Sequence, residues 1–224
     1  MALILNIETS TKICSVSLSL KGKTLAVVEE LGQQYIHSEK LTLFIEDLFS
    51  KLNYSLNDLD AICVSKGPGS YTGLRIGVSC AKGLCYALSI PLISIDSLTI
   101  LSAFFTKKNK VSDANAILYP MIDARRMEVF TLKKEEIVAL ILDENTFDNI
   151  EKPIYLFGDG ANKLKELYKD KSNITIVPNF ETSSVGMEKI GYQKFINKEW
   201  EDVAYFEPFY LKEFIAIPSK KKLL

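Results

Sequence analysis

The residues best suited to chemistry in this chain are three glycines and a pair of hydroxyls. Gly67, Gly69 and Gly73 fall in the run GPGSYTG. Glycine lets the backbone take dihedral angles closed to residues with a Cβ, so such a loop can wrap its amides around an anion or simply turn a corner. Thr9 and Ser10 follow the first apolar run, where hydroxyls could face the same phosphate or serve local turn hydrogen bonds, which is the commoner arrangement. Thr9, Ser10, Gly67 and Gly69 are therefore our candidate nucleotide contacts.

The spacing of these residues excludes several familiar sites. A Walker loop needs a glycine, four residues and Gly-Lys-Ser/Thr, but Ser17 stands where the first glycine of Gly22-Lys23-Thr24 would have to be. The three loop glycines are spaced one residue too widely for a dinucleotide fingerprint. His37 is the sole histidine, and the four cysteines lie in apolar runs without the paired spacing of a zinc site. We expect reduced thiols, no metal site and no catalytic residue.

The helix expected after the glycine loop has an unusual distribution of polar residues. Its polar side chains form one narrow stripe, and the rest of its circumference is apolar: the stripe is Arg75, Ser79, Lys82 and Tyr86. Small residues at 73, 77 and 81 repeat every four positions and would form a shallow groove that another helix can approach closely. The helix could be buried within its own domain, or it could cover the sheet with one face and a partner protein with another.

Composition places the chain among globular proteins of one or two domains. Of its 224 residues 47% are hydrophobic and 25% charged, which allows a sizeable core. Its 27 basic and 28 acidic residues nearly cancel, which argues against nucleic-acid binding by bulk charge. No apolar run reaches the roughly 18 residues typical of a membrane span, so we expect no membrane association and a cytoplasmic location.

Strands and helices are expected to alternate in two similar halves. Residues 2–31 read as three strands in series, followed by an amphipathic helix over 35–53 capped at Ser38, the strand and loop of 61–73, a helix, the strand LISI and a helix from about 96 to 105. Beyond the polar run 107–113, three more candidate strands and the segment IYLFGDGANKLKELY, read as strand, glycine loop and helix, echo this order. The prediction is an α/β protein of two lobes, residues 1–106 and 107–224, in which the terminal segment packs back on the first lobe.

Several motifs together resemble the TsaB family, also called YeaZ. They are ILNIETST, IHSEKLTLFI, LDAICVSKGPGSYTGLRIGVSCAKGLCYAL, PLISIDSL and IDARRMEVF, with GDGA and EPFYL as later anchors. The match is dense from about Leu3 to Ala103 and patchier beyond. The resemblance implies the actin-like ATPase (ASKHA, ribonuclease H-like) fold, with two lobes of mixed sheet and flanking helices. It also implies a role beside the catalytic protein TsaD in making N6-threonylcarbamoyladenosine in tRNA.

The resemblance also indicates what this chain lacks. TsaD carries two metal-binding histidines just after the strand that corresponds to PLISI, and those positions are Ser97 and Leu101 here. A hydroxyl and an aliphatic side chain cannot replace two imidazole ligands. The family pattern therefore implies a noncatalytic subunit that binds and activates TsaD.

The same pattern implies how the chain assembles with other proteins. In the family, the helices after IHSEKL and GPGSYTG pair with their counterparts on TsaD, so we place the partner interface at Gly73, Gly77, Ala81 and Leu84. The complex is expected to include a TsaE-type ATPase and to contact tRNA as an assembly. Any nucleotide would be shared with the partner, since no cofactor of its own is expected, and the chain alone would pair with itself as a homodimer.

The main alternative is an autonomous ATPase or kinase of the same fold. Phosphoryl transfer needs magnesium-linked carboxylates and a charge clamp around the phosphates. Glu8, Asp123 and Asp159 are the only well-placed acids, and the glycine loop proper carries no lysine. A metallopeptidase is a more distant alternative, because no pair of histidines is available to bind its metal.

Overall fold

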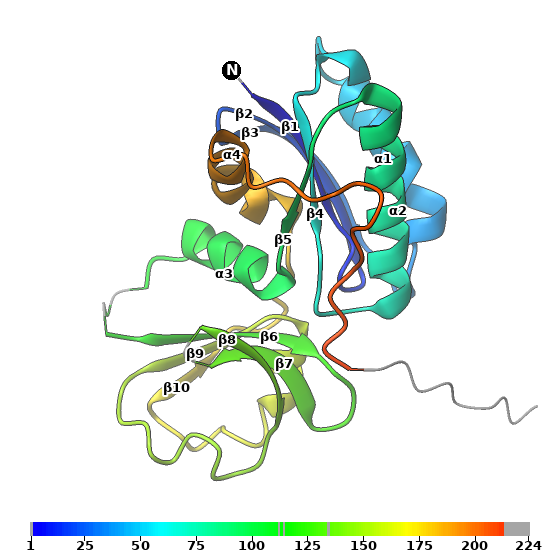
Figure 1. The fold of residues 1–224 in the computed structure, drawn as a ribbon. Coiled ribbons are helices and arrows are strands. Elements are labelled where there is room, and N and C mark those ends of the chain that lie inside the picture. The colour runs from blue at the N-terminus through cyan, green and yellow to red at the C-terminus, as the bar shows by residue number, and fades with distance from the viewer. Residues whose placement is uncertain (1, 112, 114, 134, 213–224) are drawn as a thin grey trace, which may run out of the picture.

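Two five-stranded sheets form the framework of the protein (Figure 1). The computed structural model describes residues 2–111, 113, 115–133 and 135–212. In the first sheet the strand order is β3-β2-β1-β4-β5, with β1–β2 and β2–β3 antiparallel and β1, β4 and β5 parallel. Its strands are β1 (Leu3–Glu8), β2 (Ile13–Leu20), β3 (Lys23–Leu31), β4 (Ala61–Ser65) and β5 (Leu92–Ile95).

The second sheet repeats this topology. Its order, β10-β9-β6-β7-β8, has the same pattern of two antiparallel and two parallel pairings as the first. The expected echo between the halves is therefore present in the strand order. The strands are β6 (Ile117–Asp123), β7 (Glu128–Lys133), β8 (Glu136–Ile141), β9 (Ile154–Phe157) and β10 (Ile174–Ile176).

The expected helix after β9 does not form as an α-helix. Asp159–Leu164 is instead a 3₁₀ helix, η2, followed by turns. Ala161 and Leu164 are buried and Leu167 is partly buried, all packed in the core of the second sheet. An apolar spacing of three residues matches the three-residue turn of a 3₁₀ helix, which explains the difference.

Helices cover both faces of the first sheet (Figure 1). α1 (His37–Ser50) and α2 (Tyr71–Leu88) lie on one face, where they form a core with β1, β2 and β4. The short η3 (Ser184–Met187) and α4 (Glu188–Ile196) pack on the other. η1 (Leu56–Asp58) precedes β4.

The starts of α2 and α3 follow local capping rules, whereas α1 and α4 start without a side-chain cap. Ser70 caps α2 by accepting a hydrogen bond from the amide of Gly73, and Asp96 caps α3 (Ser97–Lys108) through the amide of Thr99. In α1 the N-cap is Ile36, without a side-chain cap, so the predicted cap at Ser38 is wrong.

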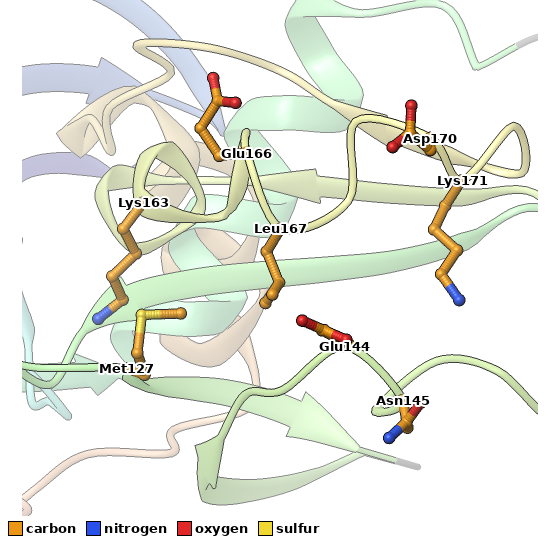
Figure 2. Close-up of a pocket in the computed structure, with 8 residues that line it drawn as sticks. All are labelled: Met127, Glu144, Asn145, Lys163, Glu166, Leu167, Asp170 and Lys171. Atoms are coloured by element: carbon orange, nitrogen blue, oxygen red, sulfur yellow. The ribbon is translucent and has the colours of Figure 1, made fainter.

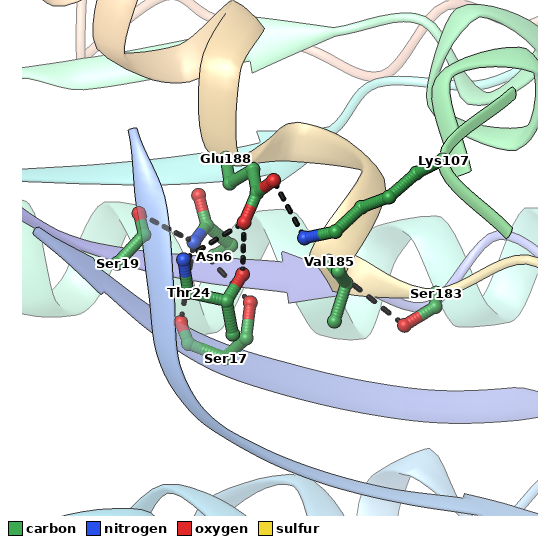
Figure 3. Close-up of polar contacts among 8 residues, drawn as sticks. All are labelled: Asn6, Ser17, Ser19, Thr24, Lys107, Ser183, Val185 and Glu188. Atoms are coloured by element: carbon green, nitrogen blue, oxygen red, sulfur yellow. Dashed lines mark hydrogen bonds and ion pairs between the residues drawn. The ribbon is translucent and has the colours of Figure 1, made fainter. Parts of the chain in front are cut away.

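α3 joins the two lobes. Phe105 is fully buried and stacks on Phe157 of β9, with ring centroids 3.8 Å apart. At the end of α3, Lys107 reaches the buried carboxylate of Glu188 at 2.6 Å, and the other oxygen of Glu188 accepts bonds from the amide and hydroxyl of Thr24 (Figure 3). These contacts hold α3, α4 and β3 together.

After α4 the chain runs back along the first lobe before its end approaches the second. The Glu201 backbone pairs with Leu92 of β5, and the following residues run along α2 (Figure 1). Residues 213–224 of the expected terminal segment lie outside the described residues. In the described part of the chain, no helix is both long and apolar enough to cross a membrane.

Candidate functional site

The glycine loop and the turn after β1 lie directly against each other. Gly67 and Gly69 have φ values of +110° and +158°, which favour glycine. A Cβ at Gly69 would stand 2.3 Å from the carbonyl oxygen of Ser10, and the amide of Ser70 donates to that oxygen at 2.6 Å. The structure thus brings together the four candidate nucleotide contacts, Thr9, Ser10, Gly67 and Gly69.

The backbone amides of this cluster serve the chain itself. The amide of Thr9 donates to Ser65 Oγ at 3.3 Å, and the amide of Ser10 donates to Glu8 Oε1 at 2.7 Å. Thr9 and Ser10 are fully buried. Burial also raises the pKa of the Glu8 carboxyl, although the hydrogen bond from the amide of Ser10 acts in the opposite direction. The described loop is therefore closed against its own lobe, and nucleotide contact by these residues stays a prediction.

Several buried polar atoms around the loop have no hydrogen-bond partner among the described residues. Ser97, whose amide donates to the carbonyl of Gly67, leaves its hydroxyl unpaired. The others beside the loop and the start of α2 are Glu8 Oε2, Thr9 Oγ1, Ser10 Oγ and His37 Nδ1. Buried polar groups are usually paired, so a cluster of exceptions marks this region as unusual.

His37 has a structural position that its sequence context partly predicted. It is the first residue of α1, as expected, and its ring is buried. Nε2 donates to the carbonyl of Thr11 at 2.8 Å, because that carbonyl can only accept. Burial lowers the pKa of His37, outweighing this bond. His37 therefore links α1 to the turn after β1.

The small-residue stripe of α2 faces the interior of the protein. A Cβ at Gly73 would stand 2.2 Å from the Thr9 carbonyl oxygen, and one at Gly77 would stand 2.2 Å from Thr9 Oγ1. Ala81 is fully buried. The placement of these three residues at a partner interface is therefore wrong for this structure: they let α2 sit closely on the turn after β1. Leu84, the fourth, is partly buried and packs on the first core.

The outer side of the α1–α2 layer carries exposed apolar and aromatic side chains. On α2, Tyr86 is 84% exposed, and on α1, Leu43 is 54% exposed. Arg75 and Ser79 are also exposed, so the predicted polar stripe does face outward. We use the term outer helical face for the exposed surface of α1 and α2 that carries the side chains of Leu43 and Tyr86. Sequence reasoning overlooked it because Tyr86 was counted as one more member of the polar stripe.

Acidic groups meet at the end of the second sheet. Asp159 Oδ1 accepts the Asp123 amide at 2.9 Å, and Lys163 pairs with Asp123 at 2.6 Å. Burial raises the pKa of Asp159 to about 6, and it raises that of Glu181, which sequence reasoning overlooked, to about 7 with help from the charge of Asp159. Among the described residues, no group of three His, Cys, Asp or Glu side chains is arranged to hold a metal ion.

Ser97 and Leu101 occupy the first and second turns of α3. Both side chains are buried, and Leu101 packs with aromatic residues between the lobes. Neither side chain offers a nitrogen ligand, so the position that corresponds to the TsaD histidine pair has no imidazole in this chain.

Away from the glycine loop, the described residues also line cavities. One of about 650 Å³ lies in the second lobe, where Leu167 points between Met127 and Glu144 (Figure 2). Another of about 590 Å³ lies between α3 and α4 beside Lys107 and Glu188. No predicted site residue lines either cavity.

Comparison with known proteins supports the sequence resemblance. The family model described as TsaD, tRNA N6-adenosine threonylcarbamoyltransferase, matches residues 32–219. The tRNA threonylcarbamoyladenosine biosynthesis protein TsaB of Escherichia coli is 27% identical over 239 aligned positions, covering 97% of this chain and 99% of that protein. TsaB of Haemophilus influenzae is 32% identical over 127 residues, but this match spans 57% of this chain and about half, 51%, of that relative.

A solved structure confirms the predicted fold class. YeaZ from Pseudomonas aeruginosa superposes with a TM-score of 0.74 at 23% identity, over 94% of this chain and all of that one. This likeness shows the two-lobed α/β fold with its mixed sheets and flanking helices. With the family model and the TsaB relatives, it establishes that the chain belongs to the TsaB (YeaZ) family of tRNA threonylcarbamoyladenosine biosynthesis proteins.

Proposed function

We propose that this chain is a noncatalytic subunit required to form N6-threonylcarbamoyladenosine in tRNA. It binds a TsaD-type catalytic protein and activates it. The names of its relatives place the family in this modification, and the family model that matches most of the chain is that of the threonylcarbamoyltransferase itself.

The observation that carries the proposal is the outer helical face. Tyr86 and Leu43 lie on neighbouring helices with most of their surface in solvent. Aromatic side chains such as tyrosine are common anchors of protein interfaces, and an exposed leucine adds apolar contact area. α1 and α2 start side by side, as the closeness of His37 to Gly73 indicates. Their outer surfaces present ridges and grooves against which helices of a partner can pack.

The proposal moves the partner interface from the buried stripe to the outer side of the same helices. Leu84 borders this surface because it is partly exposed, whereas Gly73, Gly77 and Ala81 support α2 from within. We propose the same surface for a homodimer of the isolated chain. A TsaE-type ATPase and tRNA would join through the assembled complex, in the cytoplasm.

The packing of the glycine loop argues against the alternative of autonomous nucleotide turnover. The loop amides that would bind phosphate are directed to Ser10 and Ser70, and a buried carboxyl, Glu8, lies beside them. We therefore propose that any nucleotide is shared with the partner. Calorimetry with ATP on the isolated chain would test this, and tight binding with turnover would contradict it.

The test of the interface is a binding measurement on matched tyrosine variants. Tyr86→Ala should weaken binding to the TsaD-type partner about 30-fold, because truncation of an interface anchor costs about 2 kcal/mol. Leu43→Asp should weaken it further by placing a charge in an apolar contact. Tyr205→Ala is the control, because Tyr205 is also 84% exposed but lies on the C-terminal segment. Unchanged affinity in both helix variants would contradict the proposed interface.

A further inference from the structure

A single C-terminal segment, residues 201–212, touches both lobes. At its start, Ser94 of β5 donates to the Glu201 carboxylate at 2.5 Å. At its end, Lys212 pairs with Glu128 of β7. Figure 1 shows the segment, orange to red, running beside α2 and then down toward the second lobe. We call residues 201–212 the latch.

Two basic side chains of α2 hold the latch in place. Lys82 Nζ donates to the carbonyl oxygens of Ala204 and Phe206 at 3.1 and 2.9 Å. Arg75 Nε donates to the hydroxyl of Tyr210 at 3.2 Å, and its guanidinium lies 4.1 Å from the centre of the Tyr71 ring. Part of the polar stripe of α2 therefore binds the C-terminal segment of its own chain.

An aromatic contact fixes the end of the latch near the start of α2. The rings of Tyr71 and Tyr210 have centroids 4.6 Å apart. Aromatic pairs at this distance add to the free energy of simple area burial, and an arginine over the ring adds a cation–π contribution. Tyr210 is thus held both by the ring of Tyr71 and by the side chain of Arg75.

The latch covers the glycine loop directly. The amide of Phe209 donates to the carbonyl of Lys66 at 2.6 Å, and the carbonyl oxygen of Phe209 lies 2.5 Å from where a Cβ of Gly67 would stand. Gly67 is therefore required here for a second reason besides its φ of +110°, because a larger residue would push the latch away.

The closed latch contacts Lys66 and Gly67, which adjoin the buried polar groups of the loop. Ser97 contacts Gly67 through its amide, and Ser10 contacts Gly69, yet both hydroxyls lack a partner among the described residues, as does Glu8 Oε2. Burying unpaired polar groups costs free energy, which opposes the contacts that hold the latch closed. Tyr205 and Phe209 of the latch are exposed, and a surface segment outside the helices and strands is the kind of element that opens locally.

We propose that the latch is a mobile cover of the glycine loop, closed in this structure, whose release from α2 opens the polar cluster of Glu8, Ser10 and Ser97 to small polar molecules. The closed form rests on Tyr210, Lys82 and the backbone pairing of Phe209 with Lys66. This proposal goes beyond the interface on the outer helical face, because it concerns access to the loop and does not depend on any partner.

Hydrogen exchange on the full chain tests the proposal. Tyr210→Ala removes the ring contact and the bond from Arg75, and it should speed exchange about 10-fold or more in the peptides that span residues 66–73 and 205–211. Tyr205→Ala is the matched control, since it deletes the same side chain from the latch at a position that is 84% exposed. It should leave residues 66–73 at the wild-type rate.

A second pair of variants tests the other contact. Lys82→Met keeps the aliphatic length but loses both bonds to the latch, so it should also speed exchange at residues 66–73. Lys165→Met, at an exposed position of the second lobe, should not. The proposal would be overturned if neither Tyr210→Ala nor Lys82→Met changed the exchange rate at residues 66–73. It would also be overturned if the control variants Tyr205→Ala and Lys165→Met raised that rate as much as the test variants do.

Discussion

Two glycines on the same helix should respond to alanine in opposite directions. Gly77 is buried, and an added Cβ would stand 2.2 Å from Thr9 Oγ1, well inside any van der Waals contact. Thr9 is itself fully buried and branched, so it has little room to move. At Gly83, less than two turns further along α2, no described atom outside the adjacent backbone of the helix and the neighbouring residues lies within 4 Å of an added Cβ. Comparing Gly77→Ala with Gly83→Ala therefore separates the steric clash of the new methyl group from the gain in helix propensity that both variants share.

The expected magnitudes follow from these distances. Alanine is favoured over glycine inside a helix by about 1 kcal/mol, so Gly83→Ala should raise the free energy of unfolding by about that amount. At Gly77 the same gain is offset by an overpacking cost of about 2–3 kcal/mol, which leaves a net loss of about 1–2 kcal/mol. For a chain of this size, 1 kcal/mol shifts Tm by about 2–4 °C, so the two variants should differ by about 4–12 °C.

Thermal and urea unfolding of both variants, with a second substitution at Thr9, would test this reasoning. Thr9→Ala removes the hydroxyl that Gly77→Ala would strike, so the double variant should recover most of the loss. If Gly77→Ala proved as stable as Gly83→Ala, or if Thr9→Ala failed to relieve it, the small-residue stripe would not pack on the turn after β1 as described.

Three further predictions concern buried charges. Because the pKa of His37 is lowered by burial, the folded state binds its proton less well than the unfolded state, so stability should fall as pH drops below about 6.5, and His37→Gln should flatten this slope in urea titrations. Because the pKa of Glu8 is raised, the free energy of unfolding of the wild type should fall as pH rises above about 4.5. Glu8→Gln removes this carboxyl, so its stability relative to the wild type should increase between about pH 4 and pH 8 in the same urea titrations. Lys107→Met should lower the free energy of unfolding by about 1 kcal/mol by removing one partner of the buried Glu188, while Lys165→Met should have no effect.

Local patterns in the sequence predicted most of the elements. Alternating residues such as Ile13 to Leu20 predict a strand, and the GPGSYTG run predicts a turn into a helix, because both signals are contained within a few residues. The repeated order of strands and loops also predicted that the second sheet follows the first.

Contacts between distant segments could not be predicted in the same way. The small residues of α2 face inward because the turn at Thr9, 68 positions before Gly77, packs against them, and no local pattern encodes that choice of face. The latch likewise depends on Tyr210 meeting Arg75, 135 residues apart in the chain. Thr9, Ser10, Gly67 and Gly69 were grouped in the sequence because hydroxyls and loop amides could face the same phosphate, but the contact of Phe209 with this loop was not visible in the sequence.

The most direct test of the central claim is reconstitution of the tRNA modification. Purified TsaD-type protein, with its other partners and tRNA, would be assayed for N6-threonylcarbamoyladenosine with this chain, without it, and with the Tyr86→Ala and Tyr205→Ala variants. We predict that the modified nucleoside forms with the wild type and with Tyr205→Ala, and that little forms without the chain. Tyr86→Ala should form less product, and a higher concentration of this variant should restore product formation because its defect is weakened binding. Full activity in the absence of the chain, or product formed by the chain without the TsaD-type protein, would contradict the account.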